Sequence, residues 1–124
     1  MNASHLPKPL RQATGRAGAA SAIAELQHRS HEAASLLKAL ANPHRLMLLC
    51  HLLGAECSVA DLGQVTGIAQ PTLSQQLGVL RNEGLVATRR EGKSVHYRVA
   101  APAVRVLLRA LHSLYCAPGA AASH

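Results

Sequence analysis

The 124-residue sequence carries a net charge of +7, lacks Trp and Phe, and is about half apolar (48%). A chain of this length forms one domain with at most a short tail, and Leu, Val and Ala must fill its core. No apolar run approaches the ~20 residues that span a bilayer, and the N-terminus lacks the apolar core of a secretory signal. We therefore expect a cytoplasmic protein without a membrane partner. The basic excess indicates a polyanionic partner, although charge kept for solubility stays an alternative.

The chain begins without a helical or strand pattern. Residues 1–22 are rich in Ala, Pro and Gly with scattered basic side chains, which predicts a disordered basic arm. Apolar positions then suggest one amphipathic helix over about 22–41. Asn42 suits an N-cap and Pro43 the first position of a further helix, about 43–53. That helix is apolar on several sides, so we expect it to be central.

Two short helices joined by a Gly-containing turn follow, which is the pattern of a helix-turn-helix. Ser58 and Asp61 fit a variant of the capping box and open the first, about 59–66. The second, about 71–83, is apolar on one face and carries small hydrogen-bonding side chains on the other. In a major groove Gln can pair with adenine, and Ser or Thr with several bases. We predict a recognition helix with these candidate DNA contacts: Gln70, Thr72, Ser74, Gln75, Gln76 and Arg81.

A hairpin after the helix-turn-helix predicts a wing. Residues 85–90 form its first strand, 91–94 its loop, and 95–99 its second strand, in which apolar and polar residues alternate. Positive charge at or near the tip suits phosphates or a minor groove. The candidate contacts here are Arg89, Arg90 and Lys93, and a solvated hairpin with incidental charge is the alternative.

The last helix, about 102–116, has an apolar stripe that needs a partner. We infer a homodimer through the terminal helices, because proteins that bind duplex DNA commonly pair two half-sites by two-fold symmetry. The predicted partner is thus a double-stranded operator with an inverted repeat. The folded domain is expected over 23–116, with a flexible tail at 117–124. The fold class is mainly α with a small β-hairpin: a winged helix-turn-helix in the order α-α-α-α-β-β-α.

Several motifs in this order resemble the ArsR family of dimeric winged-helix repressors. They are residues 40–46 (LANPHRL), 70–77 (QPTLSQQL), 80–86 (LRNEGLV) and the basic wing that ends in Tyr97-Arg98. The resemblance covers about 30–116. It implies a repressor, not an enzyme, that binds DNA until an inducer disables the binding.

The metal sites of that family have no counterpart here. Members that respond to arsenic or cadmium resemble one another in a Cys-x-Cys-Asp-Leu-Cys box, and residues 58–63 of this chain retain only the Asp-Leu pair. Cys57 lies one place outside the box and alone cannot complete a soft-metal site. Zinc and cobalt members carry acids and histidines on the last helix, where this chain offers only His112. We expect no metal and no cofactor, and a metal- or metalloid-responsive repressor is the alternative function.

Cys50 and Cys116 resemble the thiol pair of another branch of the family, the persulfide- and polysulfide-sensing repressors of the BigR and SqrR type. There the two thiols become linked, by a disulfide or through added sulfur atoms, and the dimer releases DNA. The resemblance implies that Cys50 and Cys116 form a redox switch, with a persulfide, a polysulfide or another thiol oxidant as inducer. Taken singly, each cysteine is more simply a small core residue. Cys57 receives no function.

Two other functions are alternatives to a regulated repressor. A thiol oxidoreductase would need a Cys-x-x-Cys motif or a nucleophile with its base, and the sequence has neither. A non-specific architectural DNA-binding protein would show a steep salt dependence without sequence preference.

Overall fold

The computed structural model describes residues 15–116. The chain divides between Lys38 and Ala39 into two compact units, and each is described by itself. We call them the N-terminal unit and the C-terminal unit. The C-terminal unit contains every candidate site residue.

The N-terminal unit holds two helices where the sequence predicted one. These are α2 (Gly15–His28) and α3 (Ser30–Leu40), whose last two residues belong to the C-terminal unit. The break falls in a polar stretch without apolar side chains to anchor a continuous helix, and Ser30 belongs to a residue type that favours helix starts. Helix α2 also begins inside the arm predicted at 1–22, so the disorder prediction is wrong for 15–22. Residues 1–14 and the tail predicted at 117–124 lie outside the described residues.

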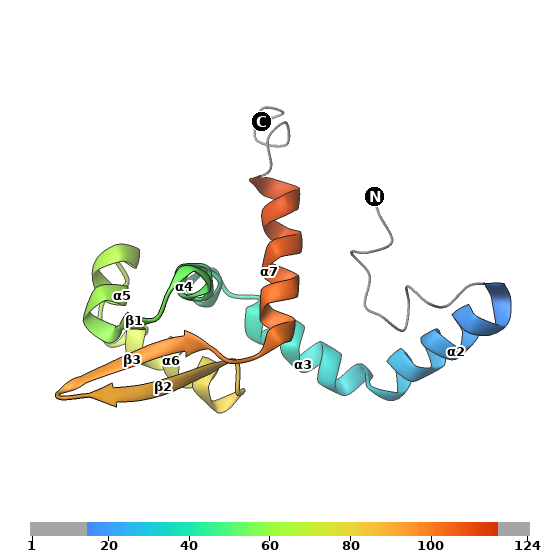
Figure 1. Ribbon diagram of the computed structural model, residues 1–124, viewed down its shortest axis with the longest axis horizontal. Helices are drawn as coiled ribbons and strands as arrows, with labels where there is room; N and C mark the ends of the chain where they lie inside the picture. Colours follow the sequence, from blue (N-terminus) through green and yellow to red (C-terminus); the bar gives the residue numbers. More distant parts are fainter. Residues whose placement is uncertain (1–14, 117–124) are drawn as a thin grey trace. The chain divides into compact units, whose positions relative to one another are not determined.

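The C-terminal unit is mainly helical with a small sheet, which confirms the predicted winged helix-turn-helix. Its elements are α4 (Pro43–Gly54), β1 (Cys57–Ser58), α5 (Val59–Thr66), α6 (Thr72–Asn82), β2 (Val86–Glu91), β3 (Ser94–Val99) and α7 (Pro102–Tyr115) (Figure 1). Helices α5 and α6 form the helix-turn-helix, and β2 with β3 forms the wing.

Local signals in the sequence account for the helix boundaries. The Asn42 side chain accepts a hydrogen bond from the Arg45 backbone N–H at 3.1 Å, and Ser58 does the same for Asp61 at 3.1 Å. Both are N-caps, as predicted. Gly67 ends α5 with φ 72°, a left-handed conformation that costs glycine little. Pro71 is the N-cap of α6 rather than its first residue, which moves the predicted start by one position.

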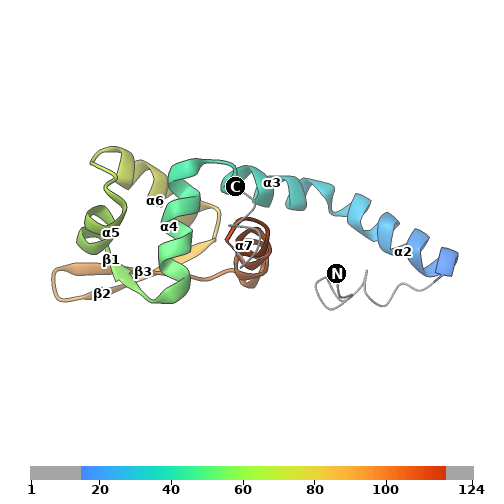
Figure 2. The ribbon, with the colours of Figure 1, turned by 90° about the horizontal axis from the view of Figure 1, so that it is seen from above.

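The sheet has the strand order β1-β3-β2, and all pairs are antiparallel. The wing runs in register from Val86 opposite Val99 to Glu91 opposite Ser94. Strand β1 was not predicted, because two residues show no hydrophobic period. It pairs Cys57 with Tyr97, so it ties the start of the helix-turn-helix to the wing. In both ribbon views the wing tip lies at the end of the unit away from α7 (Figure 2).

Helix α4 forms the centre of the C-terminal unit, as its apolar sequence predicted. It contacts α5, α6 and β3. The fully buried side chains come from four helices: Leu48, Leu49 and Leu52 of α4, Leu62 of α5, Leu77 and Leu80 of α6, and Val104 of α7. The core therefore fixes the recognition helix directly against α4.

Replacing Asn42 with Ala is expected to lower the free energy of unfolding by about 1 kcal/mol, because the first turn of α4 loses its cap. Urea unfolding followed by circular dichroism measures this. Asn82→Ala, at the exposed end of α6, is the control and should change stability by less than about 0.5 kcal/mol. Equal losses in both variants would contradict the capping role.

Candidate DNA interface and thiol pair

Some polar side chains on and beside α6 form hydrogen bonds within the protein, and others form none among the described residues. The Gln70 side-chain oxygen accepts hydrogen bonds from the Ser74 hydroxyl at 2.5 Å and the Ser74 backbone N–H at 3.3 Å. These two candidates therefore lie together at the start of the helix, where Gln70 satisfies a backbone donor that Pro71 leaves uncapped. Gln75 is exposed and, among residues 15–116, has no side-chain partner. Thr72 is half-buried, and Arg81 is exposed in the last turn.

Gln76 is tied to the helix that precedes the helix-turn-helix. Its side-chain oxygen accepts a hydrogen bond from Arg45 Nη1 at 2.8 Å. Arg45 Nε also donates to the backbone oxygen of Ala39 at 2.5 Å, so the guanidinium is held from two sides. Both side chains are half-buried. Helix α4 thus contacts the recognition helix through a polar link as well as through the core.

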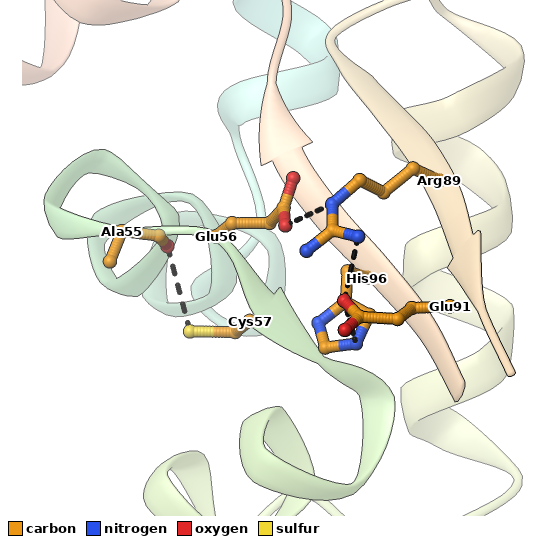
Figure 3. Close-up of polar contacts among 6 residues, drawn as sticks. All are labelled: Ala55, Glu56, Cys57, Arg89, Glu91 and His96. Carbon is orange, nitrogen blue, oxygen red and sulfur yellow. Dashed lines mark hydrogen bonds and ion pairs between the residues drawn. The ribbon is translucent and has the colours of Figure 1, made fainter. Parts of the chain in front are cut away.

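The wing cations also differ in their engagement. Arg90 and Lys93 are exposed, with no partner among the described side chains. Arg89 donates from Nε to Glu56 at 2.5 Å and from Nη1 to Glu91 at 2.7 Å (Figure 3). Its guanidinium holds the pKa of Glu91 below the usual value, first through the hydrogen bond and then through its charge. Two carboxylates offset the charge of Arg89, whereas the charges of Arg90 and Lys93 have no such partner among the described side chains.

If these carboxylates hold Arg89 away from DNA, releasing it will strengthen DNA binding. A Glu56→Gln/Glu91→Gln variant is expected to bind DNA several-fold more tightly, with a salt slope that is steeper by roughly one unit per wing. Fluorescence anisotropy over a series of salt concentrations measures both quantities. The matched control is Glu25→Gln/Glu32→Gln, which removes as many negative charges and releases Arg29 outside the C-terminal unit. An identical gain in the control would show a general charge effect.

The two candidate switch cysteines lie on neighbouring helices as free thiols. Cys50 is on α4, and Cys116 is the residue that caps α7. Figure 1 views α4 nearly end-on and α7 from the side, and Figure 2 reverses this, so the two helices cross. A contact of 3.4 Å from Arg105 Nη1 to the backbone oxygen of Leu53 joins them.

The pKa of Cys50 is raised from its ordinary value for two reasons. Partial burial of the thiol raises this pKa, and the negative charge of Cys116 raises it further. The residue remains exposed to solvent, so this burial is only partial. A negative charge on Cys116 therefore disfavours ionisation of the Cys50 thiol.

Replacing Cys116 with Ser is expected to lower the pKa of Cys50, because the neighbouring negative charge is removed. The rate of Cys50 alkylation, measured against pH in a Cys57→Ser background, gives this pKa. In the Cys57→Ser background the pKa of Cys50 should lie above that of a free thiol. When Cys116 is also replaced with Ser, the pKa of Cys50 should fall. An unchanged midpoint would mean that the two thiols do not interact.

The third cysteine is separate from this pair. Cys57 lies on β1, is half-buried, and contacts the backbone oxygen of Ala55 at 3.6 Å (Figure 3). Between residues 15 and 116, His, Cys, Asp and Glu form no group of three or more that could hold a metal ion. The same part of the chain has no helix long and apolar enough to cross a membrane.

Sequence reasoning did not single out Arg45 and Glu56. Arg45 stands inside the LANPHRL stretch, but its partner Gln76 is 31 positions further along. Glu56 precedes β1, and its partner Arg89 is 33 positions away. No periodicity or capping signal connects such pairs, so only the folded chain shows them.

Comparison with known proteins decides the family. The family described as "Bacterial regulatory protein, arsR family" has a sequence model that matches residues 42–88, from the N-cap of α4 into β2. The biofilm growth-associated repressor of Xylella fastidiosa is 50% identical over 93 residues, which are 75% of this chain and 82% of that repressor. The chain belongs to the ArsR family. The resemblance found in the sequence is thereby confirmed.

Solved structures of similar proteins agree with the fold. The crystal structure of the repressor BigR from Xylella fastidiosa matches with a TM-score of 0.72 at 49% identity, over 75% of this chain and 95% of that one. Reduced HlyU from Vibrio cholerae matches with a TM-score of 0.71 at 43% identity, over 75% and 98%. As an ArsR family protein the chain is a DNA-binding transcriptional regulator and not an enzyme, as predicted.

Proposed function

We propose that this ArsR family protein is a homodimeric transcriptional repressor whose operator binding is switched by crosslinking of Cys50 and Cys116. The observation that supports the proposal is that the two thiols lie on crossing helices, where the charge of Cys116 raises the pKa of Cys50. One of those helices, α4, also contacts the recognition helix α6. A change that pulls α7 toward α4 therefore acts on an element that holds the DNA-binding surface.

Persulfides supply both the sulfur and the oxidising equivalent. A thiolate of the pair attacks the outer sulfur of a persulfide R–S–SH, and the S–S bond of the persulfide breaks. The R–S group leaves as the thiol RSH, and the cysteine becomes Cys–S–SH. The second thiolate then attacks the inner sulfur, a disulfide bond forms, and H₂S leaves. With an organic trisulfide R–S–S–S–R the first thiolate attacks the central sulfur, one S–S bond breaks, RSH leaves and Cys–S–S–SR remains. The second thiolate then attacks the middle sulfur, a second RSH leaves, and the bridge contains one additional sulfur. The longer bridge spans a wider gap than a disulfide, whose Cα atoms must lie about 4.4–6.8 Å apart.

The proposed dimer forms through the terminal helices. On α7, Val106, Leu114 and Tyr115 are 56%, 60% and 63% exposed, although all three are large and apolar. Exposed apolar side chains on the terminal helix of a small basic protein fit contact with a second copy of the chain. Two-fold symmetry then presents two α6 helices to successive major grooves, about 34 Å apart on an inverted repeat. We place this dimer in the cytoplasm, with the DNA that it regulates.

We assign the DNA contacts according to which side chains already form a hydrogen bond or ion pair within the protein and which do not. We propose that α6 contributes base contacts and the wing backbone contacts. Gln75 is the foremost base contact because it is exposed and free, whereas Gln70, Thr72, Ser74, Gln76 and Arg81 complete the surface. Arg90 and Lys93 bind phosphates, and Arg89 positions the wing from within its ion pairs. The printed name of the Xylella fastidiosa relative, a repressor, supports repression as the outcome of binding.

Titration of a labelled inverted repeat from the protein's own promoter tests this function. The reduced dimer should bind it in preference to a scrambled duplex, and polysulfide should weaken that binding. Zinc and arsenite should leave it unchanged. Release by either ion, with stoichiometric uptake, would instead support a metal-responsive repressor.

A further inference from the structure

Gln75 and Gln76 are adjacent on the recognition helix, but their amides have different partners. The Gln75 amide is exposed and has no side-chain partner among the described residues. The Gln76 amide is half-buried, and its oxygen accepts a hydrogen bond from Arg45 at 2.8 Å. Sequence reasoning gave both glutamines the same role.

Arg45 is a fixed donor. Its backbone N–H binds the Asn42 side chain in the first turn of α4, and its Nε donates to the backbone oxygen of Ala39. A guanidinium is charged at every physiological pH and has no acceptor atom, so only the oxygen of an amide can face it. The contact therefore fixes the orientation of the Gln76 amide, with the oxygen toward α4 and the NH₂ group as the end left for another partner.

We propose that Arg45 is a specificity-determining residue that makes Gln76 a hydrogen-bond donor in the major groove. This inference rests on the proposed function, in which α6 contacts base edges. A glutamine that pairs with adenine uses both ends of its amide, the oxygen on N6 and the nitrogen on N7. Because its oxygen is directed at Arg45, Gln76 presents mainly its NH₂ group, which suits an edge made of acceptors. Guanine offers two acceptors, O6 and N7. Gln75 keeps both ends of its amide for adenine.

Each half-site therefore contains a guanine that Gln76 recognises. When Arg45 is replaced, the protein's base preference at that position changes. Binding is measured to a set of duplexes that carry every single base-pair substitution in the inverted repeat. Gln76→Ala is expected to reduce the preference for guanine at one position of each half-site by roughly ten-fold. Arg45→Met frees the amide oxygen, so adenine should become acceptable at that same position. Arg105→Met is the matched control, because Arg105 is also half-buried and donates within the C-terminal unit, but away from α6.

A further variant keeps the test valid if Arg45→Met unfolds. Gln76→Glu retains an acceptor for Arg45 but has no donor, so it should preserve the melting temperature and lose the guanine preference. An unaltered preference profile in Gln76→Ala, or in a folded Arg45→Met, would overturn the inference. So would an equal change in Arg105→Met. Failure of the proposed function is a separate result, since the wild-type protein and Gln75→Ala would then show no base preference at any position.

Discussion

A Cys50→Ser variant is expected to bind the operator as tightly as the wild-type protein and to remain bound when polysulfide is added. Coupling between a switch and a distant binding site is typically worth about 5–150-fold in affinity, so polysulfide should weaken wild-type binding by roughly ten-fold or more. The variant should change by less than about two-fold, because a single remaining thiol cannot close the bridge between α4 and α7. Anisotropy titrations with and without polysulfide, under anaerobic conditions, measure both affinities.

The three cysteines provide their own controls. Cys116→Ser should behave as Cys50→Ser does, whereas Cys57→Ser should respond to polysulfide like the wild-type protein. Cys57 lies on β1 and contacts a backbone oxygen of the adjoining loop, so its loss leaves the α4–α7 pair intact. If Cys50→Ser and Cys116→Ser both still release DNA, the switch lies elsewhere in the chain.

Replacing Arg90 and Lys93 with Ala is expected to weaken operator binding by on the order of a hundred-fold at 0.1 M salt. Both side chains are exposed and unpaired among the described residues, so their charge is available to phosphates. A dimer loses four such contacts. At about 0.9 unit of slope for each phosphate contact, the dependence of log affinity on log salt should become shallower by roughly 3–4 units.

The matched control is Arg29→Ala/Arg109→Ala, which removes the same charge from α2–α3 and α7 instead of the wing. This control should retain the wild-type salt slope. If the wing variant binds all sequences more weakly but keeps its sequence preference, the wing contacts the DNA backbone rather than the bases. A salt slope that stays unchanged in Arg90→Ala/Lys93→Ala would contradict the wing assignment.

The sequence predicted the elements whose signals are local. The spacing of Leu73, Leu77 and Leu80 defines the buried face of α6, and all three side chains are buried. Asn42 and Ser58 mark helix starts through side-chain hydrogen bonds that span three positions. Such signals depend on a few neighbouring residues, so periodicity and capping rules find them without the tertiary structure.

The features that sequence rules missed depend on residues far apart in the chain. Strand β1 is a strand only because β3 lies beside it. The partners of Gln76 and Arg89 are set by how α4, β1 and the wing pack, so these side chains looked equivalent to Gln75 and Arg90 in the sequence. The effect of the Cys116 charge on the pKa of Cys50 likewise depends on how α7 crosses α4, which no local pattern specifies.

The most direct test of the redox switch is intact-protein mass spectrometry combined with DNA occupancy on the same polysulfide-treated samples. A Cys50–Cys116 link within one protomer should appear as a loss of two hydrogens, with or without added sulfur, and a digest should recover the two joined peptides. We predict that the linked fraction rises in proportion to the DNA released, and that a reductant reverses both. DNA release without this link, or complete linkage with the operator still bound, would contradict the account.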